Sequence, residues 1–339
     1  MPALSKFRLF LAFIATGLLL GCRPGDLLRE QVYQGGALGT SYAIKLYAPG
    51  TMDLQPGIDS VFRVINQSLS TYLPDSDISR INRGDTTVAV DAQFREVFEA
   101  SGLIYRRTGG YFDPTVGVLV DAWGFGPGPA LEMDSLRADS LLQYVGFDKV
   151  RLTPDHRVVK QRHGIRLDFN AIAKGYAIDR LAAMIEKQGI RDYLVEVGGE
   201  LRARGGNLDK GQDWRVGIDD PQVEQGRAIK RIIVLADQSM ASSGNYRKFR
   251  IDSLTGQKYV HTVDPHTGFT RNANILAATV LAPTCMVADG YATAFMAMDL
   301  EASRQLLSES PELEGYLIYL DGEGETREFM TPGFEALLR

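Results

Sequence analysis

Apolar residues recur along the chain with two spacings, and the spacings predict interspersed helices and short strands. Spacings of three and four residues over 58–69 and over 94–105 place the apolar side chains on one face of a helix. Strict alternation of apolar and polar residues instead predicts strands. The predicted strands are 41–47, 193–197, 201–204, 214–218 and 228–235.

The stretch 167–180 joins an apolar run to a segment with helical spacing. Ala173, Ala177, Leu181 and Ile185 form the row expected on a buried helix face. Asp168 or Asn170 is the predicted N-cap of this helix, because a short polar side chain can accept a hydrogen bond from the free amides of a first turn.

Lys174 then falls near the positive end of the helix dipole, where a cation is mildly unfavourable. That placement suits a bound anion such as phosphate, held by free amides and the ammonium group. Gly175 has no side chain and would let another group approach the backbone. The alternative is an ordinary corner between a strand and a helix, with a solvated lysine.

The first residues have the pattern of a targeting segment. Lys6 and Arg8 precede an apolar run, 9–20, that is too short to cross a bilayer. The run ends in Leu-Leu-Gly-Cys, which predicts a lipoprotein signal peptide over 1–21, lipidation of Cys22, a tether over 22–30 and one folded domain over 31–339. The protein would then be anchored in a bacterial cell envelope, facing away from the cytoplasm. A plain secretory signal is the alternative.

Composition excludes several classes of protein. The net charge is −5, and removing Lys6 and Arg8 leaves 35 basic against 42 acidic residues, a charge of −7, which argues against a nucleic-acid partner. With only two cysteines, a lipidated Cys22 would leave Cys285 without a disulfide partner, as a small buried residue. No zinc spacing, P-loop or dinucleotide-binding glycine pattern is present.

Two segments are predicted to be loops, one polar with a single proline and one rich in glycine and proline. The first, 69–82, carries one aromatic residue, Tyr72. The second, 110–126, is predicted to be neither regular helix nor central strand, and to expose amides that could hold a polar ligand. Trp123 and Phe125 in it are interpreted as packing residues.

Three further patterns bear on chemistry. Asp289 and Thr293 are four residues apart and share a helix face, which offers the hard oxygen ligands that Mg²⁺ prefers; an ion-free polar patch is the alternative. His261 lies on a predicted strand, and a packed core residue and a proton-transfer group are equally open for it. Glu196 and Glu200 flank a hairpin turn and are assigned no catalytic role.

The segment Asp-Phe-Asn-Ala-Ile-Ala-Lys-Gly-Tyr-Ala, 168–177, resembles the D-L-x-x-I-A-K-G-Y-A block of the ApbE family, the FAD:protein FMN transferases. Further blocks resemble the same family in the same order, from Gly39 to Thr293 and beyond. They include L-G-T-S-Y at 38–42, the Tyr72 loop, G-Y-F-D-P-T-V-G at 110–117, S-S-G-N-Y at 242–246, H-T-V-D-P-H-T-G at 261–268 and A-D-G-Y-A-T-A at 288–294.

The resemblance implies Mg²⁺-dependent transfer of FMN from FAD to a threonine or serine hydroxyl of a target flavoprotein, with release of AMP. FAD would be the substrate, and the target would be a subunit of a membrane redox complex. The pyrophosphate would lie near the Lys174 helix start, and His261 is the candidate base. The implied flavin-nucleotide contacts are Leu38, Tyr72, Tyr111, Phe112, Asp113, Asp168, Lys174 and Val263. The implied metal ligands are Asp289, which is also catalytic, Thr293 and the carbonyl of Ala171.

The predicted fold is α+β, with mainly antiparallel sheets and packed helices, in one catalytic unit of one or two lobes. Two other functions remain open. One is a Mg²⁺-dependent FAD pyrophosphatase, with water as the acceptor. The other is a non-catalytic lipoprotein that binds flavin.

Overall fold

The structure is a computed structural model that describes residues 28–128, 130–223, 228–244, 249–251, 258–260, 262–271 and 274–339. The predicted signal peptide, Cys22 and His261 lie outside the described residues. Within them, no helix is both long enough and apolar enough to cross a membrane.

An eight-stranded sheet organises the chain, in the order β1-β2-β5-β6-β10-β13-β14-β15, and every neighbouring pair is antiparallel. Its strands are β1 (Leu28–Ala37), β2 (Thr40–Pro49), β5 (Tyr193–Val197), β6 (Glu200–Arg204), β10 (Ser239–Gly244), β13 (Ile275–Ala282), β14 (Glu314–Leu320) and β15 (Thr326–Met330). The predicted α+β class with mainly antiparallel sheets is confirmed.

Three smaller sheets complete the β-structure of the described residues. A three-stranded sheet contains β7 (Gly206–Asn207), β8 (Gln212–Asp219) and β9 (Ile229–Leu235). Two hairpins pair β3 (Val150–Leu152) with β4 (Val158–Lys160), and β11 (Phe249–Ile251) with β12 (Lys258–Val260).

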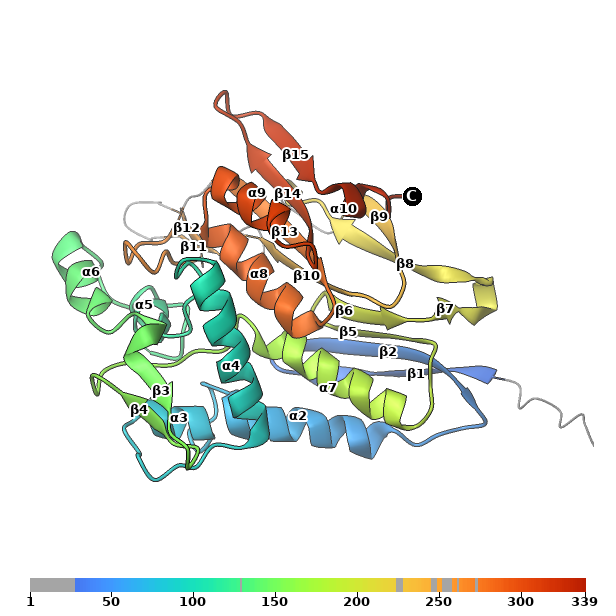
Figure 1. Ribbon diagram of the computed structural model, residues 1–339, viewed down its shortest axis with the longest axis horizontal. Helices are drawn as coiled ribbons and strands as arrows, with labels where there is room; N and C mark the ends of the chain where they lie inside the picture. Colours follow the sequence, from blue (N-terminus) through green and yellow to red (C-terminus); the bar gives the residue numbers. More distant parts are fainter. Residues whose placement is uncertain are drawn as a thin grey trace, which may run out of the picture.

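Helices α7 and α8 pack against one face of the large sheet, and α2 and α4 pack onto those two helices (Figure 1). The helices are α2 (Gln55–Leu69), α3 (Asp77–Asn82), α4 (Ala92–Arg107), α5 (Gly117–Ala122), α6 (Ser135–Leu142), α7 (Ala173–Lys187), α8 (Cys285–Ala297), α9 (Leu300–Ser308) and α10 (Pro332–Glu335). Their apolar faces and the sheet form the main core. A second core fills the space between the other sheet face, β8, β9 and α10.

Two tight turns lie together at one end of the sheet. Leu38 and Gly39 connect β1 to β2 with φ values of 52° and 74°, and Gly198 and Gly199 connect β5 to β6 with 63° and 93°. Positive φ at both central residues is what a two-residue hairpin requires. The amide of Gly198 donates to the Ser41 carbonyl at 3.0 Å, so the turns are neighbours. Leu38 and the start of β6 therefore border the same end of the sheet.

Several local expectations were wrong. Helix α7 begins at Ala173 with Ile172 as its N-cap, and neither Asp168 nor Asn170 caps it. The segment 110–126 contains a short helix, α5, and the polar Tyr72 loop contains α3, which Ser76 caps. Both helices have only six residues, so their helical periodicity is too short to stand out from the glycine, proline and polar residues around them.

One boundary also differs. Strand β1 begins at Leu28, inside the expected tether of 22–30, because its pairing with β2 continues to Pro49.

Candidate functional site

Three segments distant in sequence are tied together beside the sheet. The side chain of Asn82 donates to the Leu167 carbonyl at 2.8 Å and accepts from the Leu167 amide at 2.7 Å. One residue further on, the Asp168 amide donates to the Pro114 carbonyl at 2.7 Å. The Tyr72 loop, the 110–117 segment and the start of the 168–177 segment therefore meet at one place, as functional segments of one site must.

Asp168 organises a turn instead of capping the helix. Its carboxylate accepts from the Asn170 amide at 2.7 Å. Burial raises the pKa of Asp168. Tyr72 lies close by. Desolvation, followed by the charges of Asp168 and Asp121, raises the pKa of its phenol. The residue is nevertheless 61% exposed, so its ring is available to a ligand.

In the 111–113 segment, one aromatic side chain is partly exposed and the other is buried in the core. The Tyr111 ring is half-buried and meets the His266 ring at 4.5 Å between centroids, with the Arg271 guanidinium 5.4 Å from its centroid. Phe112 is only 3% exposed and packs in the main core. Of the two aromatic residues, Tyr111 is the one that a ligand can reach.

Asp113 is buried and holds its own turn. Its carboxylate accepts from the amide and the hydroxyl of Thr115, at 2.7 and 2.6 Å. Burial raises the pKa of Asp113 to about 6, because the bonds from Thr115 offset only part of the desolvation.

Val263 is buried in a small cluster with Leu119, Trp123 and Val145, against which Val116 and Phe125 also pack. The indole of Trp123 donates to the Gly268 carbonyl at 2.9 Å. The interpretation of Trp123 and Phe125 as packing residues is confirmed. Asp264 accepts from the His266 amide at 2.8 Å and from Arg271 at 3.0 Å, so it stabilises the turn.

The charged centre of the site is a cluster that we call the lysine–carboxylate cluster, made of Lys174, Glu200 and Asp289. The Lys174 ammonium donates to Glu200 and lies 3.9 Å from Asp289. Glu200 and Asp289 are 4% and 2% exposed, so both carboxyl groups are buried. Desolvation and the neighbouring Asp289 raise the pKa of Glu200 to about 8. The two carboxylates outweigh desolvation and raise the pKa of Lys174.

This cluster changes the interpretation of two residues. Lys174 does not project from an open helix start, since its ammonium is already engaged with carboxylates. Glu200 is not solvated, and sequence reasoning missed it because a carboxylate beside a glycine turn is usually on the surface. Along β6 the acidic Glu200 directly precedes the apolar Leu201, and this polar–apolar alternation does not predict a buried carboxylate.

Helices α7 and α8 approach each other closely behind the cluster. A side chain at Gly175 would place its Cβ 2.3 Å from the Cys285 carbonyl oxygen, so the glycine serves helix packing. Asp179 accepts from the amides of Cys285 and Met286, at 2.9 and 2.8 Å, and so caps α8 from the neighbouring helix. Cys285 itself is buried and free, as expected.

The Asp289 carboxylate accepts from the first turn of α7. The Gly175 amide, which lies ahead of the first intrahelical hydrogen bond, donates to it at 3.1 Å. Within the described part of the chain, the Ala171 carbonyl, one residue before the N-cap, accepts no hydrogen bond. The Asp289 carboxylate is thus held at the start of α7, and the Ala171 carbonyl keeps its lone pairs free.

Thr293 completes the helix face predicted from the sequence. It lies one turn after Asp289 on α8, and its hydroxyl is 3.4 Å from that of Ser243 on β10. Among the described residues, no group of three or more His, Cys, Asp and Glu side chains could hold a metal. A cation here would instead be held by a mixed set of carboxylate, hydroxyl and carbonyl oxygens.

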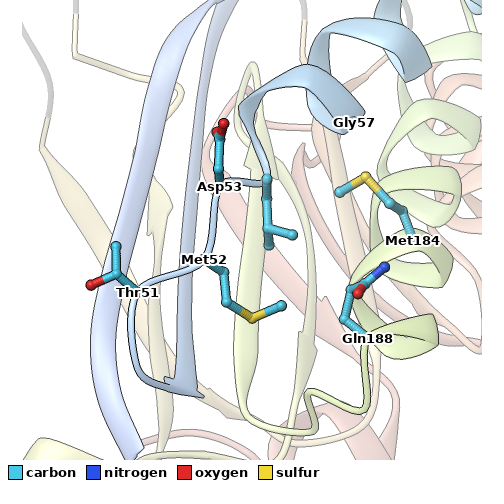
Figure 2. Close-up of a pocket in the computed structure, with 7 residues that line it drawn as sticks. Thr51, Met52, Asp53, Gly57, Met184 and Gln188 are labelled. Carbon is cyan, nitrogen blue, oxygen red and sulfur yellow. The ribbon is translucent and has the colours of Figure 1, made fainter.

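A hollow of about 430 Å³ lies elsewhere, lined by 51–54, Gly57, Met184 and Gln188. Figure 2 shows Met52 and Met184 extending toward it from the loop before α2 and from α7. Met184 is ten residues after Lys174 on one helix, which corresponds to about 15 Å along its axis. The hollow is therefore separate from the lysine–carboxylate cluster.

Comparison with known proteins agrees with this geometry. The profile of the ApbE family matches residues 38–317. The FAD:protein FMN transferase of Vibrio cholerae serotype O1 is 35% identical over 346 residues, covering 98% of this chain and 99% of that protein. The corresponding protein of Escherichia coli K12 is 30% identical and covers 91% of this chain and 89% of its own length.

Solved structures show the same fold. The flavin transferase ApbE from Vibrio cholerae superposes with a TM-score of 0.81 at 32% identity, covering 92% of this chain and all of that chain. The apo form of Pseudomonas stutzeri flavinyl transferase ApbE gives 0.80 at 28% identity, covering 92% of this chain and 97% of that chain.

Proposed function

The chain belongs to the ApbE family, and on that basis we propose that it transfers FMN from FAD to a threonine or serine hydroxyl of a target flavoprotein and releases AMP. The relatives that match over nearly their whole length carry the name of this activity. The observation that carries the proposal within this structure is the buried carboxylate of Asp289, which the Gly175 amide holds at the start of α7 beside Lys174.

We propose that Asp289, Thr293 and the Ala171 carbonyl hold Mg²⁺. The donor set consists of hard oxygens, as this ion prefers. The Asp289 carboxylate is oriented by the Gly175 amide, and the Ala171 carbonyl accepts no hydrogen bond among the described residues. When bound, the ion would neutralise charge on the phosphate oxygens of FAD.

The chain's own residues would position the substrate. The exposed Tyr72 ring and the half-buried Tyr111 ring supply aromatic surface for the ring systems of FAD. Lys174 supplies fixed positive charge beside Asp289 and limits the repulsion between this carboxylate and an incoming phosphate. His261 remains the proposed acceptor of the hydroxyl proton.

We further propose that the protein is attached through a lipidated Cys22 to the extracytoplasmic face of a bacterial membrane. The Leu-Leu-Gly-Cys sequence after an apolar run supports this location. The target would then be a flavoprotein subunit of a membrane redox complex with its acceptor hydroxyl on the same side. Mass spectrometry of the mature N-terminus would detect the lipid or contradict the anchor.

The test uses the chain from Arg23 onward with FAD, Mg²⁺ and a flavoprotein subunit bearing an acceptor threonine. A transferase yields AMP and a covalent FMN adduct on that threonine, with little free FMN. A pyrophosphatase yields AMP and free FMN at equal rates, whether or not the acceptor is present. A flavin-binding lipoprotein returns intact FAD. Either of the last two results would overturn the proposed activity.

Asp289→Asn tests the metal site, since the amide keeps an acceptor for the Gly175 N–H but loses the charge. We expect at least a 100-fold loss of adduct formation and of Mn²⁺ binding measured by electron paramagnetic resonance. Glu301→Gln, on the exposed surface of α9, is the matched control and should change neither. Undiminished Mn²⁺ binding in Asp289→Asn would contradict the metal assignment.

A further inference from the structure

Lys160, at the end of β4, is held by carbonyl oxygens. Its ammonium donates to Ile81 and Ile165 at 2.9 Å each and lies 3.5 Å from the Asn82 carbonyl. Among the described residues it has no carboxylate within ion-pair distance. A half-buried ammonium that relies on neutral acceptors is costly to desolvate, so its position calls for a specific explanation.

The three carbonyls belong to two segments that are far apart in sequence. Ile81 and Asn82 are the last residues of α3, and the Ile81 carbonyl also accepts from the Gly84 amide at 3.0 Å. Ile165 lies two residues before Leu167, and the Asn82 side chain hydrogen-bonds to both the amide and the carbonyl of Leu167. Lys160 and Asn82 thus join the end of α3 to the segment that leads into Asp168, and Figure 1 places β4 beside α3.

Helix α3 is in turn tied to the Tyr72 loop. The hydroxyls of Ser76 and Ser79 both donate to the Ser70 carbonyl, at 2.6 and 3.1 Å. A shift of α3 would therefore move Ser70, and with it the neighbouring Tyr72. The distance between Tyr72 and the Asp168 turn is set through this chain of hydrogen bonds.

We propose that Lys160 is a positioning residue for the flavin nucleotide: its ammonium joins α3 to the segment before Asp168 and so holds the Tyr72 loop in the geometry that binds FAD. The inference rests on the proposed function for its ligand, but the loop geometry can be tested without FAD. Lys160 contacts neither the proposed metal ligands nor the lysine–carboxylate cluster, so the chemical step should not depend on it.

The experiment compares Lys160→Ala with Lys149→Ala. Lys149 also donates to backbone carbonyls, those of Gln143 and Val145, but both lie within six residues of it. It is therefore a lysine of the same chemistry that joins no distant segments. Hydrogen exchange of 70–82 is measured without ligand, and FAD affinity and turnover are measured at saturating Mg²⁺.

In Lys160→Ala we expect faster exchange over 70–82, about a tenfold weaker FAD affinity and a kcat within about twofold of wild type. Propylammonium should restore both protection and affinity, because it replaces the missing side-chain atoms and can donate to the carbonyls. Tetramethylammonium, which has no N–H, should not. Lys149→Ala should leave 70–82 and the FAD affinity unchanged.

Unchanged exchange and affinity in Lys160→Ala, or equal effects in Lys149→Ala, would overturn the inference. Lower FAD affinity without faster exchange in 70–82 would overturn it as well, since Lys160 would then not act on FAD binding through the Tyr72 loop. If the wild-type chain binds no FAD, the proposed function fails, while the exchange of 70–82 and its rescue by propylammonium still decide the role of Lys160.

Discussion

Two partly buried lysines near the site lie in opposite surroundings. Lys174 joins two buried carboxyl groups, and these raise its pKa. Lys160 joins three neutral carbonyls, and desolvation, with a smaller contribution from Arg166, lowers its pKa to about 8. Lys174 balances charge where the helices pack on the sheet, whereas Lys160 joins α3 to the segment before Asp168.

The difference separates the two tasks of the site. The lysine–carboxylate cluster lies where α7, α8 and β6 pack together, so a change there alters buried charge and the stability of the core. The region of Lys160, α3 and the Tyr72 loop is built from short helices and turns joined by hydrogen bonds. A change there should therefore alter ligand binding before it alters stability. Substitutions in the two regions should therefore give different readouts.

The largest effect is expected for Lys174→Met, which leaves Glu200 and Asp289 buried without their cation. Breaking a buried ion pair in this way typically costs about 3–5 kcal/mol. Urea unfolding at pH 7 measures it. Lys160→Met should lose only about 1–2 kcal/mol, since neutral acceptors remain. Adding Glu200→Gln to Lys174→Met should recover part of the lost stability. Equal losses in Lys174→Met and Lys160→Met would contradict the difference drawn between the two lysines.

A smaller effect, confined to binding, is expected for Tyr72→Ala. The ring is exposed, so folding stability should change little, whereas loss of one stacking aromatic should weaken FAD binding by about 1–3 kcal/mol. Fluorescence titration with FAD measures the affinity. Phe112→Leu is the matched control on the core side, and it should lower stability more than affinity. An affinity of Tyr72→Ala equal to wild type would remove Tyr72 from the site.

The smallest effect is a pH dependence that belongs to Lys160. Its pKa is about 8 in the folded chain against 10.5 unfolded, so between these values the unfolded chain binds more protons. Wild-type stability should therefore rise relative to Lys160→Met as the pH increases from 8 toward 10, by on the order of 1–2 kcal/mol. Parallel unfolding curves of the two proteins over this range would contradict the environment assigned to Lys160.

Much of the fold was predictable because it rests on periodicity. Helices α2 and α4 and strands β2, β5 and β8 lie where apolar spacing predicts them. The pairing of Asp289 with Thr293 was equally predictable, since it depends only on helix geometry. Short elements were not: six residues of α5 in a glycine-rich segment carry less than two turns of pattern.

Periodicity and motif spacing suffice for the local facts: which long segments are helix or strand, which hydroxyl and carboxylate share a face of α8, and which blocks resemble a flavin transferase. Which charges meet depends on the packing of the elements. Lys174 and Glu200 are 26 residues apart, and Lys160 and Ile81 are 79 apart. Burial and electrostatic coupling depend on distances between elements that pack without regard to sequence separation. For that reason Glu200 and Lys160 became functional candidates only once the helices and the sheet were in place.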